Sequence, residues 1–272
     1  MEFLRITSAV NPRIKEAVRI RQRHTHEQNL LVIEGRRTIE TALEAGVDIR
    51  EVFFTDRFGS QSECRAILSG IGKKGTKIFA VADHVLTKIT DTETPQGVAA
   101  VVSYEIYSLD NFPAQKSPLY AVAGGIQEPG NLGTIIRTAD AAGAAAVIIL
   151  EGTCDVFMPK VIRATAGSIF HIPIAQAAEG HFLKWLRRRK VLLAAASADA
   201  AMSLFDAKLT SPVAFVFGNE AHGVSKAIKD AADLSLKIPI YGKAESLNVA
   251  TAAAVCLYEA ARQRRAKQTN PT

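Results

Sequence analysis

The sequence is poor in cysteine and has no long apolar run, and each shortage excludes a class of protein. Its three cysteines, Cys64, Cys154 and Cys256, are odd in number and far apart, so they form neither a disulfide framework nor the paired spacing of a zinc site. No stretch reaches the roughly 20 apolar residues of a membrane helix, and residues 1–15 lack the apolar core of a signal peptide. We therefore expect no metal, no membrane segment and a cytoplasmic protein with reduced cysteines.

The remaining composition is that of a folded chain with a small excess of positive charge. The chain has 272 residues, of which 48% are hydrophobic and 22% charged, enough to bury the cores of two ordinary domains or one large one. It carries 33 Lys and Arg against 27 Asp and Glu, a formal charge of +6. That excess favours a polyanionic partner such as RNA.

The first hundred residues alternate predicted strands with predicted helices. This pattern predicts a compact α/β sandwich, a first domain over residues 1–104. The expected strands are 30–35, 50–55, 77–82 and 97–105, and the expected helices are 11–23, 36–46, 64–75 and 82–90.

The helix at 11–23 carries four cations on its outer faces and is followed by two histidines. We read each of these charges as part of a solvated face, and keep contact with RNA phosphates as the alternative for the group. The residues are Arg13, Lys15, Arg19, Arg23, His24 and His26.

After a proline-containing linker at 105–118, the second domain, 119–262, has the near-continuous apolar strands of a doubly wound parallel sheet. The expected strands include 119–126, 144–150, 191–197, 212–217 and 234–240, and the expected helices include 131–142, 179–190 and 248–261. In the helix 179–190 we expect an apolar core face of Phe182, Trp185 and Leu186 and a charged outer end, 187–190. A frayed basic tail, 263–272, is expected to end the chain.

Three segments of the second domain share one design, in which an apolar strand leads through a polar, glycine-containing loop into a helix. In the first loop Asn131 lies where a helix would be capped and Arg137 lies on the second helical turn. For each residue alone, a helix cap and a surface ion pair are the simpler readings. A dinucleotide-binding loop is the rival interpretation, but the glycine spacing does not fit G-x-G-x-x-G.

The second loop ends a strand with Gly218, Asn219 and Glu220, and a carboxylate at the end of a buried strand needs a partner. We read the following His222 as an exposed loop residue. In the third loop Ile238 and Pro239 end a strand, and Ser246, Leu247 and Asn248 begin a helix whose free N–H groups can bind polar ligand atoms. We expect the three loops to meet in one site.

The three loops resemble a known set of motifs. GIQEPGNLGTIIRTADAAGA, FVFGNEAHGVS and IPIYGKAESLNVATAAAVCLYE look like the signature motifs of the SpoU class of SPOUT methyltransferases, over residues 119–262. Glu128 stands where this class commonly has Asp. The first hundred residues resemble the ribosomal-protein-like substrate-binding domain that often precedes the catalytic domain.

The resemblance implies an enzyme that transfers the methyl group of S-adenosylmethionine to a ribose 2'-hydroxyl of RNA, with ribosomal RNA favoured over transfer RNA. It also implies a trefoil knot and a homodimer whose sites combine residues of both subunits. The implied catalytic residues are Asn131, Arg137, Glu220, Ser246 and Asn248, and the implied cofactor-binding residues are Gly218, Asn219, Ile238 and Leu247. A non-catalytic RNA-binding protein on the same scaffold is the alternative.

Overall fold

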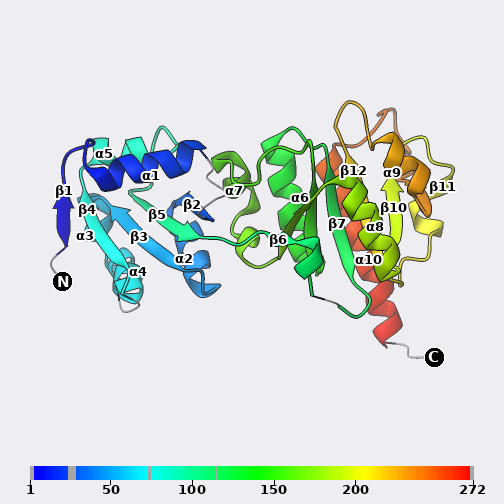
Figure 1. Ribbon diagram of the computed structural model, residues 1–272, viewed down its shortest axis with the longest axis horizontal. Helices are drawn as coiled ribbons and strands as arrows, with labels where there is room; N and C mark the ends of the chain where they lie inside the picture. The colour runs from blue at the N-terminus through cyan, green and yellow to red at the C-terminus, as the bar shows by residue number, and fades with distance from the viewer. Residues whose placement is uncertain (1–2, 24–28, 73–74, 114, 270–272) are drawn as a thin grey trace. The chain divides into compact units, whose positions relative to one another are not determined.

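The computed structural model describes residues 3–23, 29–72, 75–113 and 115–269, and Figure 1 shows their helices and strands. The chain forms two compact units. The first contains Met1–Glu105 and Phe157–Phe170, and the second contains Ile106–Val156 and His171–Thr272. No helix among the described residues is long and apolar enough to cross a membrane.

The first unit is a five-stranded sheet in the order β1-β4-β3-β5-β2, in which β5 runs antiparallel to both of its neighbours. Its strands are β1 (Leu4–Ile6), β2 (Leu30–Glu34), β3 (Ile49–Phe54), β4 (Lys77–Val81) and β5 (Val98–Ser103). Its helices include α1 (Pro12–Arg23), α2 (Arg36–Glu44), α3 (Asp56–Ser60), α4 (Ser62–Gly72) and α5 (Asp83–Ile89). The apolar faces of α1 and α5 pack on one side of the sheet against Phe53, Phe79 and Val101.

A segment from the middle of the chain completes the first unit. It contains α7 (Pro159–Thr165) and a 3-10 helix (Ser168–Phe170). Arg163 of α7 donates hydrogen bonds to Glu34 and to Asp91, each at 3.1 Å. The first unit therefore has a part that the sequence assigns to the second domain, because sequence-based boundaries assume that a domain is one continuous stretch.

The second unit is an eight-stranded sheet in the order β11-β13-β10-β12-β7-β8-β9-β6. Every neighbouring pair in it is parallel, so the prediction of a parallel α/β sheet is confirmed. Its strands are β6 (Tyr107–Ser108), β7 (Leu119–Gly124), β8 (Ala146–Leu150), β9 (Ile174–Ala177), β10 (Leu192–Ala196), β11 (Met202–Ser203), β12 (Val213–Gly218) and β13 (Leu234–Lys237). Strand β6 and a 3-10 helix (Leu109–Asn111) lie within the expected linker.

Helices cover both faces of this sheet, as the near-continuous apolar strands predict. On one face, Phe182, Trp185 and Leu186 of α8 pack with Ile228 of α9 on β7, β8, β10 and β12. On the other face, α10 contacts α6, β7 and β12. The four helices are α6 (Pro129–Ala141), α8 (Glu179–Arg189), α9 (Lys226–Ala231) and α10 (Val249–Thr269), and a 3-10 helix spans Leu204–Asp206.

Two predicted boundaries at the end of the chain are wrong. Strand β13 ends at Lys237 rather than at 240, because Pro239 cannot donate a ladder hydrogen bond. Helix α10 does not give way to a frayed tail at 262 but continues to Thr269. Its last turns are held by Gln263 and Arg264, which hydrogen-bond to the backbone between Ala207 and Ser211.

Candidate active site

The carboxylate of Glu220 lies just after β12 and is held by three donors. Its Oε2 accepts from the backbone N–H of Gln127 at 3.1 Å. Its Oε1 accepts from the N–H of Glu128 at 3.2 Å and from Nδ2 of Asn131 at 2.9 Å. The N–H donors lie just before α6 and Asn131 lies in its first turn, so Glu220 joins the second loop to the first.

Asn131 also joins these two loops to the third. Its Oδ1 accepts a hydrogen bond from Nδ2 of Asn248 at 3.0 Å, while Oδ1 of Asn248 caps α10 by accepting from the N–H groups of Ala250 and Thr251. Asn131 is not itself a cap, because Glu128 occupies the N-cap position of α6. One chain of side-chain hydrogen bonds, Glu220–Asn131–Asn248, therefore links the three predicted loops.

A tight turn from Asn219 to Gly223 places Glu220 at the end of this chain of hydrogen bonds. The backbones of Asn219 and Gly223 pair with each other. Oδ1 of Asn219 accepts from the N–H groups of Ala221 and His222, and its Nδ2 donates to the carbonyl of Gly125 at 2.9 Å. A Cβ on Gly218 would lie 2.1 Å from the carbonyl carbon of Gly223. Gly218 and the side chain of Asn219 thus shape the loop.

A fourth segment, which the sequence patterns did not identify, hydrogen-bonds to the backbone of the first loop. Thr153, which follows β8, accepts from the N–H of Gly125 at 2.9 Å through Oγ1 and donates to the carbonyl of Ala123 at 3.0 Å. The N–H of Cys154 donates to the carbonyl of Ile126 at 2.8 Å. These bonds hold the backbone just before Gln127 and Glu128, whose N–H groups donate to Glu220. A single threonine after a strand carries no recognisable sequence signal.

The hydrogen bonds around Glu220 change its acidity. Burial raises the pKa of this carboxyl, but the hydrogen bonds from Asn131 and from the backbone outweigh burial and hold the pKa below its usual range. Nearby, burial and the negative charges of Glu220, Asp155 and Glu128 raise the pKa of the Cys154 thiol to about 11. Glu220 is therefore an anion whose two oxygens both accept hydrogen bonds, and Cys154 is a neutral thiol at pH 7.

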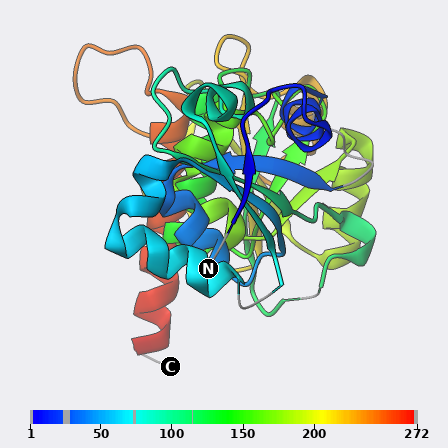
Figure 2. The ribbon, with the colours of Figure 1, turned by 90° about the vertical axis from the view of Figure 1, so that its left-hand side faces the viewer.

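The rest of the third loop stands apart from this network. Every residue from 240 to 248 is exposed, and Figure 2 shows the chain between β13 and α10 as a projecting loop. Ser246 and Leu247 lie on it outside α10, which begins only at Val249. Ile240 and Leu247 are 38% and 37% exposed, while Ile238 is half-buried. No hydrogen bond within the described part of the chain joins Ser246 to Asn131 or Glu220.

Arg137 lies on α6 but points away from Asn131. At about 100° per residue, Thr134, Arg137 and Ala141 fall within a sector of about 60°, and Arg137 lies about 120° from Asn131 around the helix. This face is exposed at all three positions. It adjoins α10, where the hydroxyl of Tyr258, 53% exposed, reaches the carbonyl of Ala141. No side chain within the described ranges pairs with the guanidinium of Arg137, so it is free to bind a ligand.

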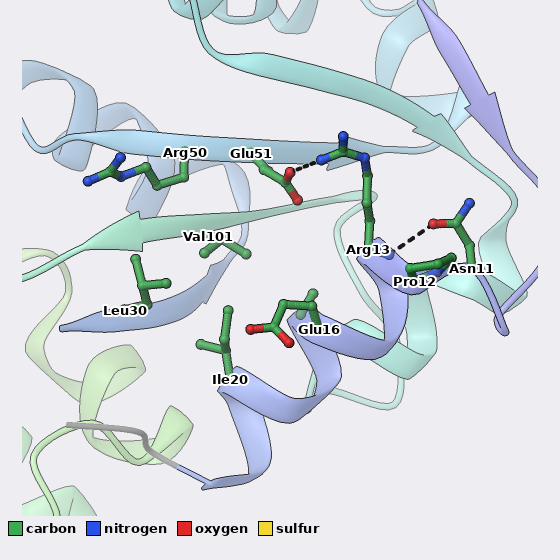
Figure 3. Close-up of a pocket in the computed structure, with 10 residues that line it drawn as sticks. Asn11, Pro12, Arg13, Glu16, Ile20, Leu30, Arg50, Glu51 and Val101 are labelled. Atoms are coloured by element: carbon green, nitrogen blue, oxygen red, sulfur yellow. Dashed lines mark hydrogen bonds and ion pairs between the residues drawn. The ribbon is translucent and has the colours of Figure 1, made fainter. Parts of the chain in front are cut away.

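The first unit has an open cavity of about 600 Å³ between α1 and the sheet, shown in Figure 3. Leu30, Val101 and Ile20 line its apolar part, and Arg13 reaches across its rim to form an ion pair with Glu51. Arg19 pairs with Glu16 in the same way. His24 and His26, predicted beside these cations, lie outside the described residues. Arg13 and Arg19 on this helix are thus already neutralised by carboxylates.

The described residues contain no group of three or more His, Cys, Asp or Glu side chains that is arranged to hold a metal ion. The site offers carboxylate and amide oxygens and backbone N–H groups, and the guanidinium of Arg137 lies on a neighbouring exposed face of α6. Such a site binds and orients an organic substrate through hydrogen bonds and one positive charge.

Comparison with known families decides which proteins share this arrangement. Residues 118–258 match the SpoU rRNA methylase family, and residues 11–100 match the MRM3-like substrate binding domain. The first match alone covers more than half of the chain. The chain belongs to the SpoU rRNA methylase family. This assignment confirms the resemblance of the three loop motifs and leaves the dinucleotide-binding interpretation without support.

Relatives of this family match almost the whole chain. A 23S rRNA (guanosine(2553)-2'-O)-methyltransferase, RlmP, of Bacillus subtilis is 32% identical over 93% of this chain and 97% of its own. A 23S rRNA (uridine(2479)-2'-O)-methyltransferase of Streptomyces viridochromogenes is 32% identical over 93% of this chain and 89% of its own. The crystal structure of an AdoMet-bound rRNA methyltransferase from Sinorhizobium meliloti matches with a TM-score of 0.85 and 31% identity, over 95% of this chain and 97% of that one.

Proposed function

We propose that this protein is an S-adenosylmethionine-dependent methyltransferase that acts on a ribose 2'-hydroxyl of ribosomal RNA. The observation that carries the proposal is the chain of hydrogen bonds Glu220–Asn131–Asn248, which unites one residue from each of the three family motifs. Ribosomal RNA is preferred over transfer RNA because the two relatives above, named for 23S rRNA, align with both units of this chain. We also place the protein in the cytoplasm, because these relatives are named for ribosomal RNA.

The residues present fit the proposed cofactor. An adenosine needs an apolar surface for its base and peptide groups for its polar edge, and both are offered by the exposed loop after β13. Ile238, Ile240 and Leu247 supply apolar side chains there, and Ser246 supplies a free hydroxyl. Gly218 supplies backbone groups without a side chain at the end of β12. When bound, S-adenosylmethionine supplies a methyl group that is activated by a positively charged sulfur.

Methyl transfer to the ribose oxygen would leave a neutral thioether, and the hydroxyl proton would pass to solvent water. A neutral hydroxyl is a weak nucleophile at pH 7, so the protein must orient it and stabilise its developing negative charge. The guanidinium of Arg137 stays protonated and offers five donors. We assign to it the binding of a neighbouring phosphate and the polarisation of the hydroxyl.

The resemblance implies a catalytic role for Glu220, but we propose a positioning role instead. A general base is most effective when its pKa lies near the working pH. The carboxylate of Glu220 instead accepts from Asn131, Gln127 and Glu128, and those bonds hold its pKa low. We therefore propose that Glu220 positions Asn131 and the first loop, and that Asn131 and Asn248 orient the reacting groups.

We further propose that the enzyme is a homodimer joined through the exposed faces of α6 and α10. Arg137 faces this surface and not Asn131 of its own chain, which suits a site completed by a second subunit. The alanine-rich start of α10 packs against α6, β7 and β12. This close packing suits the threaded C-terminal segment of a trefoil knot, which we propose for the second unit as the rare exception to unknotted chains.

The proposed activity is tested with tritium-labelled S-adenosylmethionine and separately transcribed, unmodified ribosomal and transfer RNA. We expect label in the 23S rRNA transcript and none in the transfer RNA. Label only in transfer RNA would replace the proposed substrate. Tight RNA binding without cofactor binding by calorimetry would support a non-catalytic RNA-binding protein on the same scaffold.

A further inference from the structure

The second unit has a basic surface at the edge of the sheet opposite the candidate site. Strands β7 and β12 are parallel, so the loops of the site lie at their carboxyl ends and the segments that precede them lie at the other edge. Three such segments, residues 110–118, 187–191 and 206–212, lie beside a stretch of α10, residues 259–266, and the four segments hydrogen-bond to one another. The bonds run from Arg189 to Phe112, from Ser117 to Thr210, from Gln263 to Ala207 and from Arg264 to Ser117 and Ser211. We call these four segments the basic edge.

Positive charge is concentrated at this edge. It carries nine Lys and Arg side chains and three carboxylates, an excess of six that equals the formal charge of the whole chain, +6. The remainder of the chain is therefore balanced. The cations are Lys116, Arg187, Arg188, Arg189, Lys190, Lys208, Arg262, Arg264 and Arg265, and the carboxylates are Asp110, Asp206 and Glu259.

Few of these charges are neutralised within the chain. Arg189 and Arg264 donate to backbone carbonyls, which leaves their charge uncompensated. Arg262 pairs with Glu259 at 2.7 Å, and Arg188 reaches Asp110 only at 3.5 Å. Lys116, Arg187, Lys190 and Lys208 are exposed, and no hydrogen bond or ion pair within the described ranges uses their side chains.

Ion pairs are commoner among the arginines of the first unit, although Arg21 and Arg65 donate to backbone carbonyls there. Arg5, Arg13, Arg19, Arg36, Arg50 and Arg163 each form an ion pair with a carboxylate. A run of like charges on one surface repels itself and raises the free energy of the folded state, unless a polyanion binds there. Lys and Arg bind phosphates without regard to base sequence.

We propose that the basic edge binds the phosphate backbone of the same RNA molecule whose ribose reacts at the opposite edge. The inference rests on the proposed function for the identity of the RNA. Strand β7 has six residues, so the two edges lie about 20 Å apart, a span that a folded ribosomal RNA segment covers. Binding at both edges fixes the orientation of the RNA, while the choice of nucleotide is made at the site.

The test removes the four unpaired charges in two steps from the full chain. The double variant Lys116→Gln/Lys208→Gln and the quadruple variant that adds Arg187→Gln and Lys190→Gln are compared with a matched double variant, Lys226→Gln/Lys229→Gln. Both control lysines are exposed on α9, away from the basic edge, and neither has a partner within the described ranges. Thermal unfolding establishes that each variant is folded.

Binding of an unmodified 23S rRNA transcript is measured by filter retention at several salt concentrations, separately from methyl transfer. We expect the slope of log affinity against log salt to fall by about 0.7–0.9 for each phosphate that a variant no longer neutralises. The KM for RNA should rise about tenfold in the quadruple variant, with unchanged affinity for S-adenosylmethionine. The control should match the wild type.

An unchanged salt slope in the quadruple variant overturns the proposal. A loss of affinity in the control equal to that of the matched double variant also overturns it, because the loss would then reflect net charge alone. A fall in kcat at unchanged KM also overturns it, because the edge would then support the site rather than bind RNA. If no RNA is methylated, the proposed function fails while the salt dependence of binding still decides the role of the basic edge.

Discussion

Asn131 stands at the centre of the site because an amide both donates and accepts. Its Nδ2 donates to Glu220 and its Oδ1 accepts from Asn248, so neither Asp nor Leu can replace it. The sequence placed all three residues in one site because each follows or precedes a strand end at the same edge of a parallel sheet. It did not place Thr153, because no spacing or glycine marks that residue.

Thr153 offers a test of how much the support of the first loop matters. Thr153→Val keeps the shape of the side chain but removes two hydrogen bonds, the one that Oγ1 accepts from Gly125 and the one that it donates to Ala123. At about 1 kcal/mol for each bond, kcat for methyl transfer should fall by up to roughly thirtyfold, with little change in cofactor affinity measured by calorimetry.

Thr153→Ser keeps the hydroxyl and should restore most of the rate. Thr87→Val is the control, since Oγ1 of Thr87 donates to the carbonyl of His84 on its own helix α5, in the first unit. Equal reductions in kcat for Thr153→Val and Thr87→Val would remove the special role of Thr153.

The lowered pKa of Glu220 predicts that its contribution to stability depends on pH. Because the pKa of Glu220 is lowered in the folded protein, its stabilising effect is complete above the unfolded pKa of about 4.3. The effect is lost as the pH falls through the folded pKa. Glu220→Gln should therefore lower the melting temperature at pH 7, and the difference from the wild type should shrink as the pH falls below the unfolded value.

The surrounding titratable groups are Glu128 on the first loop and Cys154 and Asp155 after β8. Glu245→Gln, in the exposed third loop, is the control, and its melting temperature is measured over the same pH range. A difference between Glu220→Gln and wild type that persists unchanged at pH 3 would show that the carboxylate charge is irrelevant.

At the scale of elements, helix α10 shows what sequence periodicity misses. The alanine-rich run predicts its start within a residue, and the basic residues after 261 predict its fraying. The structure continues it to Thr269 because Arg264 donates to the carbonyls of Leu209, Ser117, Pro118 and Ser211. Such hydrogen bonds join segments more than fifty residues apart, which a local pattern cannot reveal.

The anchoring of α10 by Arg264 is measurable. Arg264→Gln leaves several carbonyls without a charged donor and should lower the free energy of unfolding by roughly 2–4 kcal/mol. Arg188→Gln, which removes only an exposed ion pair with Asp110, should cost less than about 1 kcal/mol. Urea unfolding of both variants provides the measurement, and equal reductions in stability would refute the anchoring role.

At the scale of the whole molecule, the predicted alternation of strands and helices indicated the classes of both units, and the three loops indicated the family. The boundaries were less predictable. Residues 157–170 belong to the first unit although they lie between two strands of the second. The pairing of Arg163 with Glu34 and Asp91 depends on side chains far away in sequence.

The proposed dimer is a prediction at this scale. Sedimentation should give twice the chain mass of 29.3 kDa. Tyr258→Glu introduces a charge on the exposed α6 and α10 face and should yield a monomer that has lost methyl transfer. Phe205→Glu, at another exposed aromatic side chain, should remain a dimer. A wild type that sediments as a monomer while fully active would contradict a site completed by a second subunit.

We propose that the site joined by Asn131 methylates a ribose hydroxyl with the help of Arg137. The most direct measurement incubates unmodified 23S rRNA with S-adenosylmethionine and either the wild type or Arg137→Ala, then digests the RNA to nucleosides for mass spectrometry. We predict one 2'-O-methylated nucleoside with the wild type and none with Arg137→Ala, although the variant still binds the cofactor. A methyl group on a base, or ribose methylation at the wild-type rate by Arg137→Ala, would contradict the account.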